Sequence, residues 1–119
     1  MSTGPEELRN RTKAFAIRIV KLYRSLPHSA DSQVIGKQLL RCGTSVAANY
    51  RAACRGRSRA EWIAKIGLVV EEADETVFWL EMLSDCDIVP GQRCEDILKE
   101  ARELSAIFTA SRHTARRAS

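Results

Sequence analysis

The side chains best suited to chemistry in this sequence are basic and lie close together. They are Arg51, Arg55, Arg57, Arg59 and Lys65, with Glu61 as the only acid between them. Most are arginines, whose planar guanidinium group makes forked hydrogen bonds to phosphate. The cluster is therefore a candidate nucleic-acid site that would contact the phosphate backbone, with strong salt dependence and little sequence readout. Only Tyr50 and Trp62 accompany it, too few aromatics for a surface on which bases stack. The alternative is that these basic residues only cover the solvated end of a helical hairpin and bind no ligand.

Charge is segregated along the chain more strongly than the overall net charge of +4 indicates. Residues 37–65 carry a net charge of +6, whereas residues 67–87 contain seven acids and no base and carry −7. Long blocks of one sign favour partners of the opposite sign. We therefore expect the basic block to attract RNA or DNA. The acidic block, with Glu71, Asp74 and Glu75, is a candidate surface for a basic protein partner.

Catalysis and metal binding find little support in the remaining reactive residues. No cysteine has a histidine near it in the sequence, and His28 and His113 are the only histidines. There is no glycine-rich phosphate loop and no Cys-x-x-Cys pair. We expect no enzyme activity, no cofactor and no metal. The cysteines are expected to be buried or partly buried thiols of a reducing compartment, namely Cys42, Cys54, Cys86 and Cys94.

The basic cluster lies inside the strongest helical pattern of the chain, which extends from residue 39 to residue 80. Apolar residues recur in its second half at steps of three and four, the spacing of one helix face. Gly56 suits the left-handed conformation that often follows a helix, and Ser58 with Glu61 forms a capping box. The pattern predicts helices over residues 30–55 and 59–84, joined by a tight turn that carries the arginines.

Two further helices are predicted, over residues 5–26 and 90–111. Pro5 suits a first helical position, and Pro27 stops the first helix. Residues 112–119 are expected to form a basic tail that frays. Four helices with short connections predict a single all-α domain over residues 1–119, an antiparallel up-down-up-down four-helix bundle.

The sequence gives no sign of a membrane partner. No apolar run approaches the roughly 20 residues that a membrane span needs. The first ten residues lack the apolar segment of a signal peptide. We therefore expect a cytoplasmic protein.

Folding the central hairpin at its turn brings Arg41 within reach of Glu72 and Glu75. The simplest expectation is an ion pair that fixes the register of the two helices. Ser45 and Asn49 follow Arg41 at spacings of four. We expect them to join a polar network between helices or subunits, because an unpaired buried polar group costs about 1–3 kcal/mol. A ligand or phosphate contact is the alternative for these two residues.

The predicted helices carry more apolar surface than one core needs. The first helix has apolar residues beyond its core stripe, and the third has large apolar residues opposite its own, interleaved with acids. Such residues usually mark a subunit or partner surface. The interface candidates are Ile17, Val20, Tyr23, Leu68, Phe78, Trp79 and Met82.

The central stretch also resembles a known family on specific residues. They are Gln38-Leu39-Leu40-Arg41, Ser45, Ala48-Asn49, Arg57-Ser58, Glu61-Trp62, Lys65, Glu72-Ala73-Asp74-Glu75-Thr76 and Trp79-Leu80. On these residues the sequence is similar to the bacterial four-helix-bundle family named after a protein encoded within intervening sequences of 23S ribosomal RNA. Tyr50 and Arg51 depart from the family pattern, which has an aliphatic residue and then a small or acidic one.

The resemblance implies a protomer that assembles into a cyclic homopentamer. Relatives include the accessory protein of diversity-generating retroelements, a basic pentameric barrel that binds nucleic acid and a reverse transcriptase. We therefore predict a non-enzymatic, self-associating bundle that binds nucleic acid through the basic cluster. Two alternatives stay open: an adaptor that binds a protein through the acidic and apolar outer face of the third helix, and an assembly protein with a structural role only.

Overall fold

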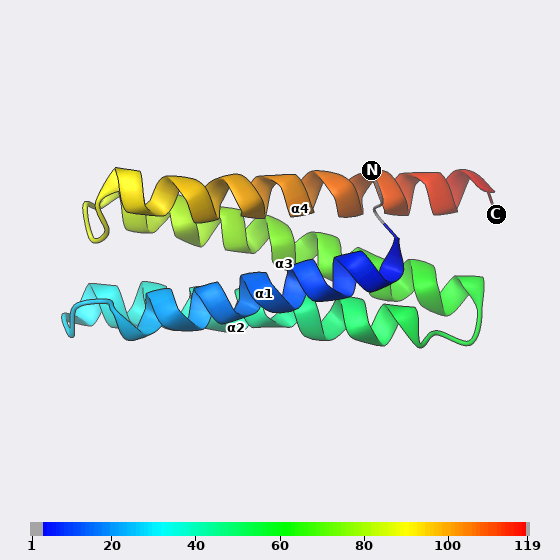
Figure 1. Ribbon diagram of the computed structural model, residues 1–119, viewed down its shortest axis with the longest axis horizontal. Helices are drawn as coiled ribbons and strands as arrows, with labels where there is room; N and C mark the ends of the chain where they lie inside the picture. Colours follow the sequence, from blue (N-terminus) through cyan, green and yellow to red (C-terminus); the bar gives the residue numbers. More distant parts are fainter. Residues whose placement is uncertain (1–3, 119) are drawn as a thin grey trace.

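The computed structural model describes residues 4–118 as four helices: α1 (Pro5–Arg24), α2 (Ala30–Cys54), α3 (Arg59–Asp85) and α4 (Gly91–Ala118). Each helix runs antiparallel to the one before it, and the described chain contains no strand (Figure 1). The predicted all-α, up-down-up-down four-helix bundle is confirmed, with dimensions of 47 × 26 × 21 Å. Residues 1–3 and 119, which the predicted domain and tail include, lie outside the described part.

The ends of α1 follow from its two prolines. The helix begins at Pro5, whose missing N–H leaves no bond unmade in a first turn. It ends at Arg24, two residues earlier than predicted. The N–H of Leu26 bonds the carbonyl of Tyr23 at 3.1 Å in a tighter turn just before Pro27.

Reciprocal hydrogen bonds hold the turn between α2 and α3. The Ser58 hydroxyl accepts a bond from the N–H of Glu61, whose carboxylate accepts one from the N–H of Arg57, both at 3.1 Å. The capping box is therefore present, although its return bond reaches one residue earlier than usual. The prediction for Gly56 is wrong, because no glycine in the described chain has a positive φ. The space there is tight, because a Cβ would lie 3.1 Å from the carbonyl oxygen of Ala53.

The prediction of a frayed basic tail is also wrong. α4 continues through Ala118, seven residues beyond its predicted end. Its last turns lie along the beginning of α3, where they share a shallow groove with Trp62. Tertiary packing of this kind stabilises helical turns beyond what local propensity indicates.

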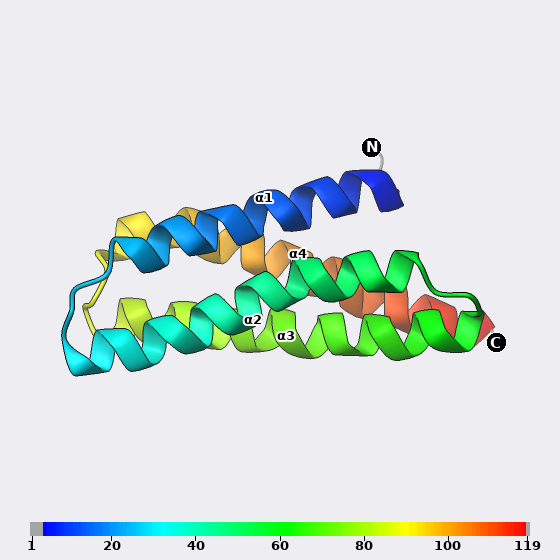
Figure 2. The same ribbon diagram turned by 90° about the horizontal axis from the view of Figure 1, so that it is seen from below.

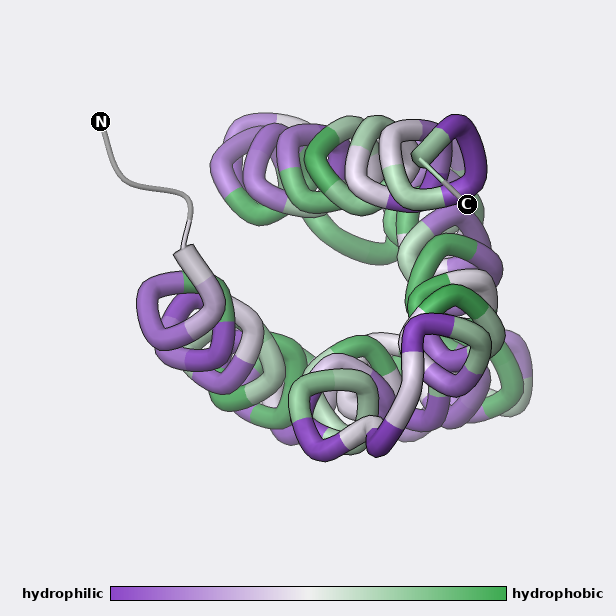
Figure 3. Tube along the Cα trace, turned by 90° about the vertical axis from the view of Figure 1, so that its right-hand side faces the viewer, coloured by the Kyte–Doolittle hydropathy of each residue, from purple (hydrophilic) through white to green (hydrophobic). Residues whose placement is uncertain are grey.

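The apolar stripes of all four helices face a common core. Seen end-on, hydrophobic segments turn toward the middle of the bundle and hydrophilic ones turn outward (Figure 3). The core includes Leu8, Phe15, Ile19, Leu39, Val46, Ile66, Val69, Leu80, Leu104 and Phe108. Val34 lies outside this core, with 63% of its surface exposed. None of the described helices combines the length and apolar character needed to cross a membrane.

The helices pack mainly in chain order. α2 packs against α1 and α3, and α3 packs against α4, whereas α1 and α4 share a smaller contact. An ion pair spans that weaker seam: Nε and Nη2 of Arg11 donate to the Glu100 carboxylate at 3.1 and 2.6 Å. The bidentate geometry fixes the position of α1 relative to α4.

α1 approaches α2 most closely where α2 carries glycine. A Cβ on Gly43 would lie 2.9 Å from both γ carbons of the fully buried Ile19. A Cβ on Gly36 would lie 2.6 Å from Cδ1 of Leu26. Beyond these contacts α1 diverges from α2 toward its N-terminus (Figures 1 and 2). This divergence creates the groove described below.

We predict that Gly43→Ala destabilises the protein. The added methyl group overpacks the α1–α2 contact at a cost of about 1–3 kcal/mol. Alanine recovers only about 1 kcal/mol through its higher helix propensity. The expected net loss is up to about 2 kcal/mol in the free energy of unfolding, measured by urea denaturation. Gly67→Ala in α3 is the matched control, because nothing lies within 4 Å of its added Cβ. Equal stabilisation by both substitutions would show that α1 and α2 are not in close contact.

Candidate nucleic-acid interface

Three segments that are far apart in the sequence lie toward the same end of the bundle. They are the first turns of α1, the α2–α3 turn and the last turns of α4 (Figures 1 and 2). We define this basic end as residues 5–13, 51–65 and 108–118. It has eleven basic side chains against three glutamates. The basic residues are Arg9, Arg11, Lys13, Arg51, Arg55, Arg57, Arg59, Lys65, Arg112, Arg116 and Arg117.

All five basic residues predicted from the sequence are exposed, but the structure divides them between faces. Arg51 lies in the last turn of α2 and Arg55 directly follows the helix, and both line a groove beside α1. Arg57 lies in the turn itself, and Arg59 borders a different, shallow groove between α3 and α4. Lys65 is six residues further along α3, a rise of about 9 Å. The structure therefore brings together only the first two of the five.

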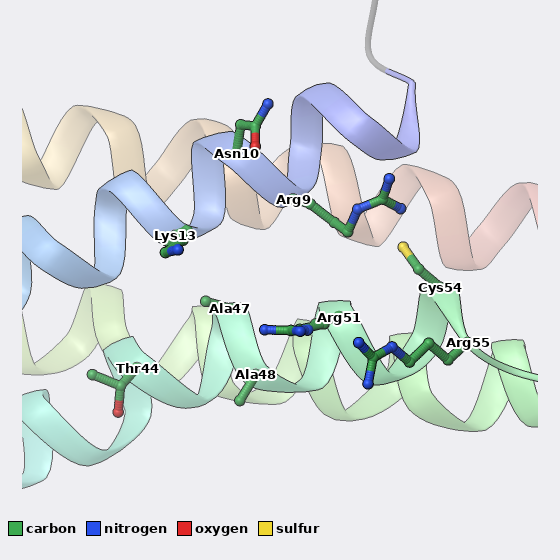
Figure 4. Close-up of a pocket in the computed structure, with 9 residues that line it drawn as sticks. All are labelled: Arg9, Asn10, Lys13, Thr44, Ala47, Ala48, Arg51, Cys54 and Arg55. Atoms are coloured by element: carbon green, nitrogen blue, oxygen red, sulfur yellow. The ribbon is translucent and has the colours of Figure 1, made fainter.

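Two basic residues of α1, which sequence reasoning missed, join Arg51 and Arg55. They are Arg9 and Lys13, and the four residues line a groove of about 690 Å³ between α1 and α2 (Figure 4). The available signal was their spacing of four residues, which places both on one face of α1. Locating that face at the basic end requires the pairing of α1 with α2.

The positive charge of the basic end is largely unpaired. None of the five predicted residues, nor Arg9 or Lys13, forms an ion pair within residues 4–118. Arg11, Arg41 and Arg102, by contrast, each form an ion pair with a glutamate. Arginines without a carboxylate partner are free to neutralise phosphates, with release of the counterions around the nucleic acid.

Arg41 links α2 to α3 through two carboxylates. Its Nη1 lies 3.2 Å from Oε2 of Glu72, and its Nη2 lies 2.8 Å from Oε1 of Glu75. Because half of the Arg41 side chain is exposed, the contacts are worth only about 0.2–1 kcal/mol. Burial raises the pKa of Glu72, and a hydrogen bond with Glu75 raises it further, against the lowering effect of Arg41.

The expected polar network at Ser45 and Asn49 does not form within the protomer. Both residues are half-buried, and neither side chain has a hydrogen-bond partner among residues 4–118. A network between subunits, or a ligand contact, therefore stays a prediction for these two.

The interface candidates differ in exposure. Ile17, Leu68 and Phe78 are 47%, 42% and 50% exposed. The other four candidates, Val20, Tyr23, Trp79 and Met82, are half-buried. Of these four, all but Val20 also pack against the core. The rings of Phe78 and Trp79 meet edge to face, 4.9 Å apart. The indole N–H of Trp79 is buried and has no acceptor in the described chain.

The remaining reactive residues are structural or isolated. Tyr50 is 3% exposed with its ring 5.0 Å from that of Phe108, so it cannot stack on a base, and burial raises its pKa. Cys86 is exposed, contrary to the prediction for the cysteines, whereas Cys54 is half-buried. The other two cysteines are buried, which raises their pKa values. Residues 4–118 contain no cluster of three or more potential metal ligands.

We predict that Glu72→Gln gains stability relative to the wild type as the pH rises. Because the pKa of Glu72 is higher in the folded protein than its ordinary value, ionisation of this group destabilises the folded state. The loss of folding free energy caused by ionised Glu72 is absent well below pH 4.5, and it is complete once the pH has passed the pKa of Glu72 in the folded protein. Urea denaturation should therefore favour the variant more at pH 7 than at pH 4. The exposed neighbour Glu71→Gln is the control for removal of a helix carboxylate. A difference that shrinks with rising pH would contradict the prediction.

Comparison with known proteins identifies the family. The chain matches the family model described as 23S rRNA-intervening sequence protein over residues 7–110. No curated protein is significantly similar to it. Its structure is similar to that of a protein of unknown function from the S23 ribosomal protein family of Bacteroides thetaiotaomicron, with 33% identity and a TM-score of 0.84. The match covers 92% of this chain and 97% of the other. The protein thus belongs to the 23S rRNA-intervening sequence protein family.

Proposed function

We propose that the protein is a non-enzymatic, self-associating helical bundle that binds nucleic acid in the cytoplasm through its basic end. The observation that carries the proposal is the concentration of eleven basic side chains against three glutamates on residues from all four helices and the α2–α3 turn. Nine of the eleven are arginines. A surface of this kind recognises phosphate geometry and charge, and it reads little base sequence.

Self-association strengthens the electrostatic argument. One protomer with a net charge of +4 attracts a polyanion only weakly. Five copies, the number that the family resemblance implies, would carry about +20 and would repeat the basic end around a ring. Phosphate contacts then add up along one nucleic-acid strand.

The exposed apolar face of α3 is the surface that we propose for self-association. Leu68 and Phe78 leave large apolar areas in water, and a subunit contact would remove them. The indole N–H of Trp79, beside Phe78, has no acceptor in the described protomer. A neighbouring subunit could supply a hydrogen-bond acceptor for this N–H group, or it could pack over the indole ring and exclude water.

We predict that replacing Arg51, Arg55, Arg57 and Arg59 by glutamine weakens binding to RNA and DNA and makes it less dependent on salt. Each lost phosphate contact lowers the slope of log affinity against log salt by about 0.7–0.9. Fluorescence anisotropy of a labelled oligonucleotide at several salt concentrations measures both quantities.

The matched control replaces four exposed basic residues far from the basic end, Lys21, Arg24, Lys37 and Lys99, by glutamine. It changes the net charge by the same amount, so we expect a smaller loss of affinity and a slope close to that of the wild type. Equal losses from both variants would reject the basic end as the binding surface. Unchanged affinity in both would reject nucleic-acid binding and favour the adaptor or structural alternatives.

We also predict that the double substitution Leu68→Ser and Phe78→Ser produces a monomer. Native mass spectrometry should show a multiple of 13.3 kDa for the wild type and a single chain for the variant. Both side chains are about half exposed in the protomer, so helix content by circular dichroism should stay the same. Leu68→Met with Phe78→Leu keeps the surface apolar and should keep the assembly. A wild-type protein that is monomeric at micromolar concentration would overturn the proposed self-association.

A further inference from the structure

The groove between α1 and α2 is more enclosed than the shallow groove between α3 and α4 at the same end of the bundle. Its volume of about 690 Å³ is typical of small-molecule pockets, which range from about 300 to 1,000 Å³. Figure 4 shows its lining residues on the two helices. They are Arg9, Asn10, Lys13, Thr44, Ala47, Ala48, Arg51, Cys54 and Arg55.

The rim of the groove carries positive charges that no acidic residue of its lining neutralises. Arg9 and Lys13 lie one turn apart on α1, and Arg51, in the last turn of α2, is four residues before Arg55, which caps the end of that helix. Like charges at this spacing on a helix repel each other, and here two such pairs line the same groove. No acidic residue lines the groove, and the four cations form no ion pair among the described residues. An anion bound between them would relieve this repulsion.

The remaining lining is small and mostly apolar. Ala47 and Ala48 leave space that larger side chains would fill, and the half-buried thiol of Cys54 adds a further weakly polar surface. Thr44 donates its hydroxyl hydrogen within α2, to the carbonyl oxygen of Leu40 at 2.7 Å or that of Arg41 at 3.2 Å. A bare inorganic anion would leave this apolar surface uncovered. A ligand that carries both a phosphate and a flat apolar group would cover it.

We propose that this groove binds one unpaired nucleotide, with its phosphate between Arg9, Lys13, Arg51 and Arg55 and its base against Ala47, Ala48 and Cys54. The inference deepens the proposed function and rests on it, because the ligand class is the same. A base within a duplex is stacked and paired, so it cannot reach the apolar surface of the groove. The site therefore prefers single strands or free nucleotides to duplexes.

The four cysteines provide a direct test by thiol alkylation. Cys54 lines the groove, whereas the exposed Cys86 lies in the α3–α4 turn at the opposite end of the bundle and serves as an internal control. Peptide mass spectrometry measures the rate of N-ethylmaleimide labelling at each cysteine. The probes are a single-stranded deoxyadenosine decamer, its duplex with the complementary strand, adenosine monophosphate and inorganic phosphate.

The proposal predicts that the single strand slows labelling of Cys54 and leaves labelling of Cys86 unchanged. Protection by adenosine monophosphate at a lower nucleotide concentration than the decamer needs would identify a free nucleotide as the ligand. Protection by the decamer at a lower nucleotide concentration than adenosine monophosphate needs would identify a nucleotide within a strand as the ligand. Equal protection by the duplex or by inorganic phosphate would overturn the proposal, and so would the absence of any protection.

A charge-neutral variant separates this inference from the proposed function. Ala48→Leu fills the groove without changing the charge, and Ala64→Leu at an exposed position of α3 is its matched control. We expect Ala48→Leu to weaken single-strand binding at least about fivefold, with duplex binding and the native mass unchanged. Wild-type single-strand affinity in Ala48→Leu, with weakened binding in the four-arginine variant, would reject the groove and retain the basic end. Unchanged affinity in both variants would reject both.

Discussion

The register of α2 against α3 determines where the charges of this protein lie. Leu39 and Val46 of α2 and Ile66 and Val69 of α3 are all almost fully buried, and burial of such apolar side chains is the main attraction between packed helices. A slip of one turn would move these stripes by about 5.4 Å and would separate Arg41 from its two carboxylates. The same register leaves the arginines of the turn at one end of the bundle, without acids opposite them. A surface charge pattern is therefore a consequence of how the core packs.

The structure also separates the two surfaces that the proposed function needs. The arginines cluster around the α2–α3 turn, whereas Phe78 lies 19 residues after Arg59 on α3. At the rise of an α-helix this corresponds to about 28 Å along the helix axis. A subunit contact at Phe78 would therefore lie far from the arginines of the turn, whereas Leu68, three residues after Lys65, would bring the contact to the edge of the basic end. Such an assembly would gather several basic ends.

Sequence reasoning succeeds here where the signal is local and fails where two helices must first be paired. Core stripes, prolines and the Ser58–Glu61 cap were sufficient to predict four helices and their order. The continuation of α4 to Ala118 depends on packing beside α3, and the place of Arg9 and Lys13 depends on the approach of α1 at Gly43. Neither contact has a signature within a few residues of sequence. Gly56 shows a related limit, because its φ is not positive and only the tight space beside the Ala53 carbonyl favours a small residue.

The most direct test of the central claim is to map where nucleic acid touches the protein. A single-stranded RNA that contains 4-thiouridine would be cross-linked to the purified protein by light, and the modified peptides identified by mass spectrometry. Our account predicts cross-links in residues 5–13 and 51–65, with few or none in the acidic stretch of residues 67–87. Cross-links concentrated in residues 67–87, or at the opposite end of the bundle around residues 25–29 and 86–90, would contradict it.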